Sequence, residues 1–405
     1  MGRRYYSGSN VERALSIDEL RQMAQRRLPG FVFEYLEGGA EDEVTLRRNR
    51  KIFDRLEFIP RTLVKSGSVD PSISIFGRRS ALPIMIAPTG FCGLFAREGD
   101  LCLARAAAAE GIPFIQSTVS NALIEDVAKV PGLRHWMQIY VFRSRAFTEQ
   151  FLARALAADC EALVITSDAT VFGNREWDRR NYAQGTDPTL LNKLDILRHP
   201  RWMMDVLAKG IPPFRNLLDF LPPGQQGLSE AATWSRKEVD PDLDWERIAW
   251  IRSLWPRKLI LKGVLSVDDA RRARDVGADG LVLTNHGGRQ LDGTISPMTA
   301  LPAIASSLRQ DMTILIDSGF RRGTDIVKAL ALGADAVLVG RAALYGLAAG
   351  GEPGGKRALA ILAEEVRRTL ALLGRPSPDL LDETCLNEAA YLLARTSLEQ
   401  AERCV

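Results

Sequence analysis

The sequence is poor in histidine and cysteine and has no long apolar run. Only three of its 405 residues are histidine, and its five cysteines are odd in number. No two of them form a CxxC pair, so we expect neither a disulfide framework nor a metal site, and a reducing cytoplasm suits such a chain. No apolar run approaches the length that crosses a bilayer, so no membrane span is predicted. Basic residues at the N-terminus have no apolar segment behind them, unlike a secretory signal.

The charge balance excludes a further class of protein. The formal net charge of +3 is too small, and too evenly spread, for a nucleic-acid binder. A hydrophobic content of 46% and a charged content of 25% are ordinary for a soluble globular enzyme. The length allows either one large α/β domain with insertions or two domains of medium size.

Short apolar runs, rich in β-branched residues, recur along most of the chain. Each is continuous rather than alternating, as expected for parallel strands buried on both faces. The eight runs are Pro83–Pro88, Pro113–Thr118, His135–Val141, Ala162–Asp168, Lys258–Gly263, Gly280–His286, Thr313–Gly319 and Ala336–Arg341.

Helical patterns lie between these runs. They cover Gly99–Glu110, Asn121–Lys129, Ser144–Ala157, Asp242–Leu254, Ser266–Val276, Gly323–Leu332 and Gly355–Leu373. Eight strands alternating with helices predict an α/β fold of the (β/α)8 TIM-barrel type rather than an open doubly wound sheet. An open sheet would also need GxGxxG after its first strand, and the sequence PTGF (88–91) lacks that pattern.

The fourth and fifth predicted strands are separated by about ninety residues, too many for one helix. Residues 181–240 contain two Pro-Pro pairs and predict an insertion at the barrel mouth. Residues before about 84 predict a helical lead-in. We therefore expect a single barrel domain over residues 1–375 and a C-terminal tail over 376–405.

Polar groups end almost every predicted strand, where barrels carry their chemistry. A ring of such groups on apolar strands indicates a bound ligand. The ring comprises Thr89, Gly90, Ser117, Thr118, Gln138, Tyr140, Thr166, Asp168, Lys262, His286, Arg289, Asp317, Arg321, Gly340 and Arg341, with Gly319 between Asp317 and Arg321. Its last members, on strands seven and eight, combine arginines with glycine amides at helix starts, which predicts a phosphate site.

His286 is the candidate base. Imidazole accepts protons near neutral pH, and Asp168 from strand four could stabilise its protonated form. Arg289 could grip a carboxylate bidentately. A base beside such a clamp suggests oxidation or proton abstraction next to a carboxylic acid. The other two histidines, His135 and His199, are expected to be structural or at the surface.

Lys262 has two interpretations that the residues themselves leave open. It could form a Schiff base, as in barrel aldolases. It could equally place its positive charge beside the ring of a bound cofactor, if that ring becomes anionic on reduction.

Several colinear motifs favour the second interpretation: FEYLEGGAEDE, APTG, QIY, SDATVFGNRE, LKG, NHGGRQLDG, IDSGFRRGTDIVKALALGA and VGR. Together they resemble the FMN-dependent α-hydroxy-acid oxidase/dehydrogenase family, and the resemblance runs from about Ile17 to Leu373. LEGGAEDE, ISPM, HPRW and LYGLAA are most similar to the branch that oxidises (S)-mandelate.

The resemblance implies a role for each candidate residue. His286 would be the base and Asp168 would stabilise its imidazolium. Arg175 and Arg289 would hold the substrate carboxylate, with Tyr35 and Tyr140 as hydrogen-bond donors, and Lys262 would stabilise the anionic reduced flavin. The remaining polar groups would bind FMN: Thr89, Gly90, Ser117, Gln138 and Thr166 at the flavin ring, and Asp317, Gly319, Arg321, Gly340 and Arg341 at the ribityl and phosphate groups.

Two departures from the glycolate-oxidase pattern bear on substrate size. That branch has alanine where Gly90 stands and a bulky tryptophan where Val119 stands. Both changes open space above the flavin, so an aromatic, mandelate-like (S)-2-hydroxy acid is expected. The alternatives are a soluble oxidase that uses O2, an L-lactate dehydrogenase, a flavin-dependent isomerase and a non-catalytic barrel.

The insertion bears on the electron acceptor. Lys193–Arg215 has five basic residues against two acidic ones, with Trp202, Met203, Met204, Val206 and Leu207 among them. Such a segment could lie in a bilayer interface, although a lid or subunit contact fits its composition as well. With the resemblance, it predicts a homotetramer peripheral to the inner face of the cell membrane, with a quinone as acceptor.

Overall fold

The computed structural model describes residues 5–184, 187–208, 210, 213–221 and 227–387. Most of the predicted tail, together with Lys209 and Pro212 of the insertion, lies outside these residues.

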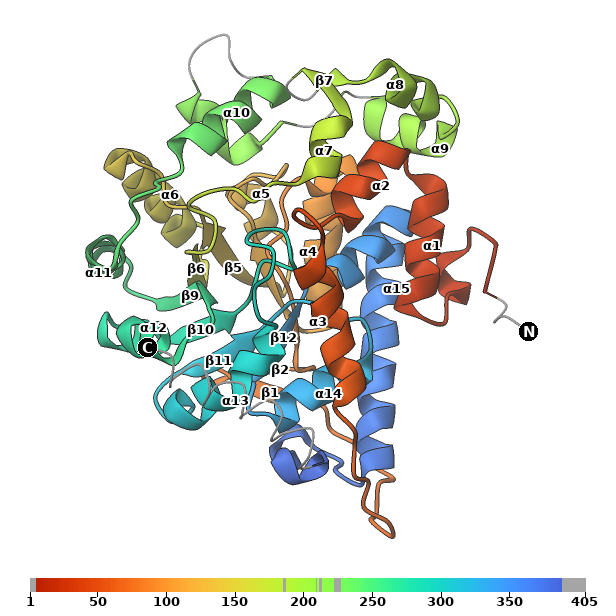
Figure 1. Cartoon of the computed structure of the whole chain (residues 1–405), viewed down its shortest axis with the longest axis vertical. Helices are drawn as coiled ribbons and strands as arrows, with labels where there is room; N and C mark the ends of the chain where they lie inside the picture. The colour runs from red at the N-terminus through yellow and green to blue at the C-terminus, as the bar shows by residue number, and fades with distance from the viewer. Residues whose placement is uncertain (1–4, 185–186, 209, 211–212, 222–226, 388–405) are drawn as a thin grey trace.

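Eight parallel strands close into a barrel in the order β3-β4-β5-β6-β9-β10-β11-β12, with helices around it (Figure 1). The predicted TIM barrel is therefore confirmed, and each barrel strand falls on one of the eight predicted runs. The strands are β3 (Ile84–Ile86), β4 (Pro113–Gln116), β5 (Arg134–Ile139), β6 (Ala162–Thr166), β9 (Lys258–Val264), β10 (Gly280–Leu283), β11 (Thr313–Ile316) and β12 (Ala336–Val339).

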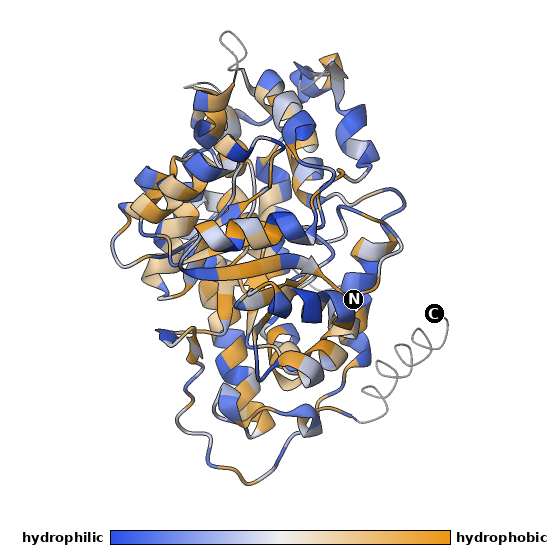
Figure 2. Ribbon diagram, turned by 90° about the vertical axis from the view of Figure 1, so that its left-hand side faces the viewer, coloured by the Kyte–Doolittle hydropathy of each residue, from blue (hydrophilic) through white to orange (hydrophobic). Residues whose placement is uncertain are grey.

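Both faces of these strands are buried, which explains why the runs are continuous. Met85 and Ile115 point into the barrel with Trp136, while Ile84 and Phe114 pack outward beneath the helices. Figure 2 shows the resulting hydrophobic strands beneath helices that are polar on their outer sides.

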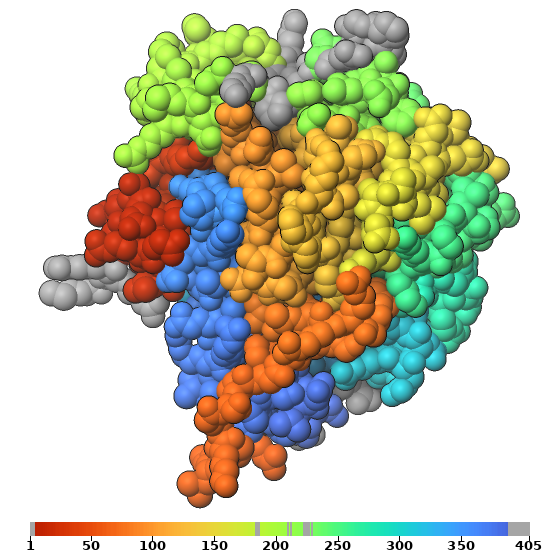
Figure 3. Space-filling model, turned by 180° about the vertical axis from the view of Figure 1, so that it is seen from behind, coloured from red at the N-terminus to blue at the C-terminus, as the bar shows by residue number. Residues whose placement is uncertain are grey.

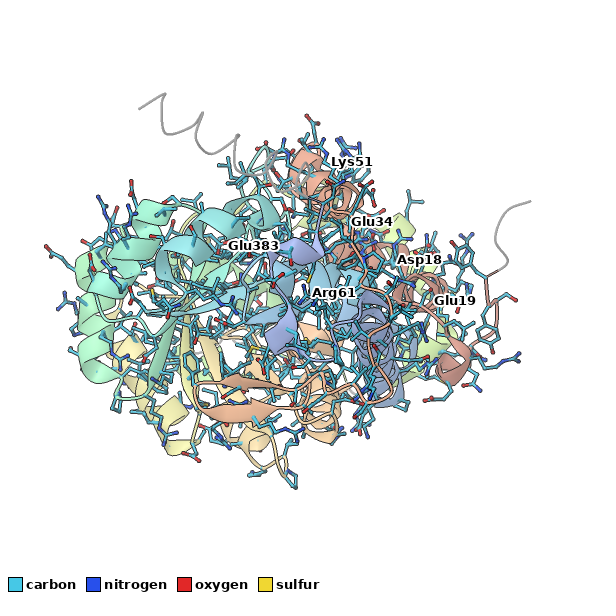
Figure 4. The ribbon with its side chains drawn as sticks, turned by 90° about the horizontal axis from the view of Figure 1, so that it is seen from below. Asp18, Glu19, Glu34, Lys51, Arg61 and Glu383 are labelled. Atoms are coloured by element: carbon cyan, nitrogen blue, oxygen red, sulfur yellow. The ribbon has the colours of Figure 1, made fainter. Side chains whose placement is uncertain are left out.

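A β-hairpin closes the end of the barrel that lies opposite the carboxyl ends of the strands. The sequence patterns did not predict this hairpin. It consists of β1 (Ile73–Ile75) and β2 (Arg78–Ser80), and Figure 4 views the molecule from this side. Ile75 joins the inner core, and the Phe76 ring lies 5.6 Å from that of Trp136. The plug closes this end and leaves the opposite end as the open mouth.

The helices around the barrel follow the predicted patterns closely. Ser144 and Ser266, the first residues of two predicted helical patterns, cap α6 and α12. The layer comprises α4 (Gly99–Ala109), α5 (Ile124–Ala128), α6 (Arg145–Ala157), α11 (Trp245–Leu254), α12 (Val267–Asp275), α13 (Pro297–Leu308), α14 (Gly323–Ala331) and α15 (Arg341–Leu373). Of these, α13 was missed because two prolines interrupt its helical pattern; Pro297 occupies its first turn.

The lead-in consists of α1 (Ile17–Arg27), α2 (Gly30–Glu37) and α3 (Val44–Arg55). Figure 3 shows α15 lying between α1 and α4 on the back of the molecule. None of the described helices has the length and apolarity needed to cross a membrane.

The insertion lies over the barrel mouth, beside α2 (Figure 1). α7 (Glu176–Arg180) leads into it, and its helices and strands include β7 (Tyr182–Gln184), β8 (Asp187–Pro188), α8 (Leu190–Ile196), α9 (Pro200–Trp202) and α10 (Leu228–Glu238). Several contacts fasten it to the lead-in. The Asp195 carboxylate accepts from the Gly30 amide at 2.7 Å, and Glu34, labelled in Figure 4, accepts from Asn181.

The prediction that Trp202 anchors the insertion in a bilayer is wrong. Trp202 is fully buried, its indole N–H donates to the Leu94 carbonyl at 2.8 Å, and its ring meets Phe31 edge-on. Val206 is also buried. The sequence could not show this, because the surface that covers Trp202 comes from residues more than a hundred positions earlier.

Candidate active site

The carboxyl ends of the strands surround a cavity of about 510 Å³. Most of the predicted site residues line it: Tyr35, Thr89, Gly90, Val119, Tyr140, Arg175, Lys262, His286, Arg289, Asp317, Gly319, Arg321, Gly340 and Arg341. The structure therefore brings together groups that are up to 306 positions apart in the chain.

Ser117, Gln138, Thr166 and Asp168 lie just behind the lining side chains. Gln138 donates to Thr166 at 2.9 Å and accepts from the Ser117 hydroxyl at 3.2 Å. Ser117 in turn accepts from the Val119 amide. These buried groups form a polar chain under the cavity wall.

His286 and Asp168 form a close pair. The Nδ1 atom of His286 lies 3.1 Å from a carboxylate oxygen of Asp168, across 118 positions of sequence. Because the Asp168 carboxylate accepts a hydrogen bond from the Nδ1–H group, the lone pair of the neutral His286 ring lies on Nε2. Burial acts to raise the pKa of Asp168, but the charges of Lys262 and His286 outweigh it and lower that pKa. The carboxylate therefore stays ionised at neutral pH.

The backbone at His286 is left-handed, with φ of +56°. Such a conformation is costly for a side chain of this size and tends to occur at functional sites. It is held by hydrogen bonds: the His286 amide donates to the Thr284 hydroxyl, and the Gly287 amide donates to Ser318. These bonds fix His286 in this conformation, in the loop that follows the end of β10 at Leu283.

Lys262 is almost completely buried beneath the same cavity. Its ammonium lies 3.6 Å from the Asp317 carboxylate and 3.5 Å from the Thr284 hydroxyl. The end of the Lys262 side chain thus lies at the cavity, beside a carboxylate and a hydroxyl.

Two arginines flank Tyr35 at the cavity wall. The guanidinium carbons of Arg175 and Arg289 lie 5.5 Å and 5.3 Å from its ring centre. Arg289 donates to the carbonyls of Tyr35 and Gly38, at the end of α2. Burial, with the neighbouring Arg175 and Arg341, lowers the pKa of Arg289 to about 9. A concentration of positive charge in a buried wall favours an anionic ligand.

Tyr140 stands opposite, at the end of β5. Burial, with Asp168 nearby, raises its pKa above the usual value, so it remains a phenol and can donate a hydrogen bond. Its ring lies 6.3 Å from that of Phe172.

The part of the cavity that is lined by Gly319, Arg321 and the start of α15 has features that suit a phosphate group. Gly319 has φ of +97°, and a β-carbon there would lie 2.3 Å from the Asn49 carbonyl oxygen, so glycine is required. Arg321 is fixed by the Tyr345 hydroxyl at 3.0 Å and by Glu37 at 3.6 Å. α15 begins at Arg341 with its free amides at the cavity.

The side chain of Arg341 differs from expectation. All three of its guanidinium nitrogens donate to backbone carbonyls, those of Leu36, Gly287 and Gly38, at 2.9–3.1 Å. The guanidinium thus joins α2 to the loop that carries His286. We therefore expect Arg341 to interact with a phosphate through its backbone amide and its positive charge. Its side-chain donors already serve backbone carbonyls.

Three features of the site were missed by sequence reasoning: Phe214 and Arg236 of the insertion line the cavity, and Asp178 lies beside Arg175. No motif marks the two insertion residues. Asp178, one helical turn after Arg175, could have been found from the i, i+3 spacing of opposite charges.

The cavity suits FMN in its chemistry. A buried ammonium lies at one end, glycines and Arg321 at a helix start lie at the other, and a polar chain runs beneath the wall. The family model for FMN-dependent dehydrogenases matches residues 24–388. The chain belongs to this family.

Named relatives of this FMN-dependent dehydrogenase agree with that conclusion. The (S)-mandelate dehydrogenase of Pseudomonas putida is 43% identical over 381 residues, covering 93% of this chain and 95% of the relative. An L-lactate dehydrogenase of Caulobacter vibrioides is 41% identical over 376 residues, covering 92% and 97%.

Solved structures agree as well. The crystal structure of the monotopic membrane protein (S)-mandelate dehydrogenase matches with a TM-score of 0.89 at 42% identity, covering 93% of this chain and 99% of that one. Mandelate oxidase with (S)-2-phenylpropionate matches with a TM-score of 0.75 at 36% identity, covering 92% and 98%. By their names, these relatives include dehydrogenases of mandelate and of lactate and an oxidase of mandelate.

Proposed function

We propose that this FMN-dependent dehydrogenase oxidises an aromatic (S)-2-hydroxy acid, such as (S)-mandelate, to the 2-oxo acid. The observation that carries the proposal is the 3.1 Å contact between His286 and Asp168, on a cavity wall that also bears Arg175 and Arg289. A base and an anion clamp in one cavity suit a substrate whose reacting carbon adjoins a carboxylate.

Each residue then has a physical task. Arg175 and Arg289 hold the carboxylate, while Tyr35 and Tyr140 donate hydrogen bonds to the substrate. Nε2 of His286 accepts a proton from the substrate, and the ionised Asp168 stabilises the imidazolium through Nδ1. FMN supplies the acceptor for two electrons, and Lys262 provides positive charge beside it.

Space near the reacting position favours a large substituent. Gly90 and Val119 are both small and lie on the cavity wall, and Phe172 and Phe214 supply aromatic surface. A phenyl ring would bury apolar area against these residues, whereas glycolate and lactate would leave the space to water. The similarity to both mandelate and lactate dehydrogenases makes this choice the first to test.

We further propose that the insertion docks on a membrane through an exposed leucine face. This face consists of Leu190, Leu191, Leu194 and Leu197, on or directly after α8, and we add Met204, seven residues further along the chain; each is 54–78% exposed. The spacing places the leucines on one side of the helix. Arg198 and Arg201 are exposed nearby and could meet anionic headgroups.

Membrane docking would bring the enzyme close to a quinone, which we propose as its electron acceptor at the inner face of the cell membrane. A homotetramer, as the family resemblance implies, is proposed for its assembled state and can be measured by sedimentation in detergent.

The test is anaerobic reduction followed by re-oxidation. The purified yellow protein should be bleached by (S)-mandelate with a higher kcat/KM than by L-lactate or glycolate. The bleached protein should regain its colour rapidly with a quinone and slowly in air. Rapid re-oxidation in air would make it an oxidase, and preference for lactate would make it a lactate dehydrogenase. Failure of every 2-hydroxy acid to bleach the flavin would reject the proposal.

A further inference from the structure

The two arginines of the cavity wall are held by different kinds of partner. Arg289 is fixed by backbone carbonyls, those of Tyr35 and Gly38. Arg175 precedes α7 and has an acidic side chain as its partner: its Nε lies 3.1 Å from an oxygen of Asp178, one helical turn later. Both side chains of this pair are mostly buried, at 19% and 14% exposure.

The contact through Nε has a geometric consequence. Within the described residues, the two terminal nitrogens of Arg175 make no hydrogen bond. Arg175 lines the cavity, so these nitrogens remain for a ligand. The Nε contact is an ion pair without hydrogen-bond geometry, since this Asp178 oxygen has no hydrogen-bond partner among the described residues. A guanidinium drawn to a carboxylate on one side leaves its other edge for the carboxylate of a ligand.

Asp178 also matters for the charge of the wall. Arg175, Arg289 and Arg341 face the same cavity, and the charges of Arg175 and Arg341 help lower the pKa of Arg289. Asp178 acts on that pKa in the opposite direction. Among the described residues, the cavity is lined by one other carboxylate, Asp317, which lies against Lys262. Asp178 is therefore the counter-ion of Arg175, and its charge also acts on Arg289.

We propose that Asp178 is a positioning residue for the substrate-carboxylate clamp: it orients Arg175 for catalysis and limits the net positive charge that the substrate meets. The proposal rests on the proposed function, since it deepens the account of the same site. Asp178 acts through Arg175 rather than on the reacting atoms.

Replacing Asp178 has two opposing consequences, one for the orientation of Arg175 and one for the positive charge of the cavity. Asp178→Asn keeps the size of the side chain but removes its charge. The orientation of Arg175 is then lost, and small misplacements of a substrate cost about 100-fold in rate. The cavity gains positive charge at the same time, so anions should bind at least as tightly as before.

The measurement is anaerobic stopped-flow bleaching of the FMN-loaded enzyme by (S)-mandelate. For Asp178→Asn we expect the limiting rate to fall by about 10- to 100-fold. The half-saturating concentration should stay within threefold of wild type or decrease. Phenylacetate, an aromatic carboxylate without the hydroxyl, should perturb the flavin spectrum at lower concentration. Glu176→Gln, which removes an exposed acid from the same helix, is the matched control and should leave all three values within twofold.

A double-mutant cycle distinguishes positioning from a separate role. Because Asp178 acts through Arg175, adding Asp178→Asn to Arg175→Met should slow bleaching no further than Arg175→Met alone. Multiplying effects, or a rate for Asp178→Asn within twofold of wild type, would overturn the proposal.

If Asp178→Asn does not retain FMN, Asp178→Glu replaces it in the cycle, because that variant keeps the charge and shifts its place. Loss of FMN from both variants would show a structural role and would also overturn the proposal. Failure of the proposed function gives a different result. The wild-type flavin would then not be bleached, while the phenylacetate titration would still report whether Asp178 limits anion binding.

Discussion

At the scale of single residues, His286 combines a strained backbone with a defined proton position. Its backbone φ is +56°, and its Nδ1 atom lies 3.1 Å from a carboxylate oxygen of Asp168. A glutamine in its place could preserve the size of the side chain but could neither accept a proton nor form an imidazolium.

We therefore expect His286→Gln to retain FMN and to lose turnover by roughly 100-fold or more, since the base and its stabilisation disappear together. Flavin absorbance and dye-linked mandelate oxidation measure the two properties. His199→Gln is the matched control, because His199 lies in the insertion outside the cavity lining and should leave both unchanged. Turnover of His286→Gln within tenfold of wild type would remove His286 from the mechanism.

Asp100 gives a prediction about pH. It is buried at the start of α4, and one of its oxygens accepts from the Asn121 amide at 3.0 Å. Its other oxygen has no hydrogen-bond partner within the part of the chain that the structure describes. Burial raises the pKa of Asp100 to about 6. The protonated form thus suits the fold, so the contribution of Asp100 to stability is complete below the unfolded pKa, near 4, and is lost as pH rises through 6.

Asp100→Asn mimics the protonated form. It should be more stable than wild type at pH 8, by up to about 3 kcal/mol, and the difference should shrink toward zero as pH falls to 4. Urea unfolding at several pH values measures this. The exposed Asp268, changed to asparagine, serves as the control. Equal stability of wild type and Asp100→Asn at pH 8 would contradict the shifted pKa.

At the scale of elements, the loops after β3 and β4 meet at the cavity wall. A β-carbon on Gly90 would lie 2.4 Å from a methyl carbon of Val119, so the two loops are in direct contact. The size of the side chain at position 119 therefore controls how much of the cavity stays open.

Val119→Trp should fill the space that we assign to the phenyl ring. We expect kcat/KM for mandelate to fall by about tenfold or more relative to lactate, because steric exclusion can exceed the effect of one lost apolar contact. Val171→Trp adds the same bulk at an exposed position outside the cavity lining and should keep the ratio. An unchanged ratio in Val119→Trp would show that the ring binds elsewhere.

The exposed leucines of α8 allow the proposed membrane contact to be tested. Replacing Leu191 and Leu194 with asparagine removes apolar area from the exposed leucine face, at about 1.5–3 kcal/mol per side chain that the bilayer would bury. The variant should pellet less with anionic vesicles while dye-linked turnover is preserved.

Leu372→Asn removes an equally exposed leucine from the far end of α15 and should pellet as wild type does. Trp202→Ala should instead destabilise the fold, because its indole is buried. Unchanged pelleting of the Leu191 and Leu194 variant would leave the insertion as a cover of the barrel mouth or a contact between subunits.

At the scale of the whole molecule, FMN would join distant parts of the chain. Its proposed phosphate end is built from β11, β12 and α15, and Tyr345 and Glu37 brace Arg321 there. A ligand that binds only the folded state stabilises it by mass action. Removal of FMN should therefore lower Tm, and added FMN should restore it.

Arg321→Met should need far more FMN to reach the same Tm, because the phosphate loses a charged donor. Arg322→Met is the control: its guanidinium is half-exposed, pairs with Glu365 and does not line the cavity. A fully yellow Arg321→Met protein after dialysis would place the phosphate elsewhere.

The sequence by itself determined the barrel and most of the site. Strands buried on both faces need continuous apolar runs, and the polar groups that end them must converge at one mouth, so His286, Asp168 and Lys262 could be placed from the sequence pattern. Local helix starts at Ser144 and Ser266 were equally legible, since capping depends only on neighbours in sequence.

Only the tertiary structure decided which apolar residues of the insertion are covered. The sequence 193–215 gives Trp202 and Leu197 the same apolar character, yet one lies beneath α2 and the other faces outward. The backbone carbonyls that accept hydrogen bonds from the Arg341 guanidinium were likewise settled by packing. Burial depends on surfaces brought together from remote parts of the chain, and no local pattern records them.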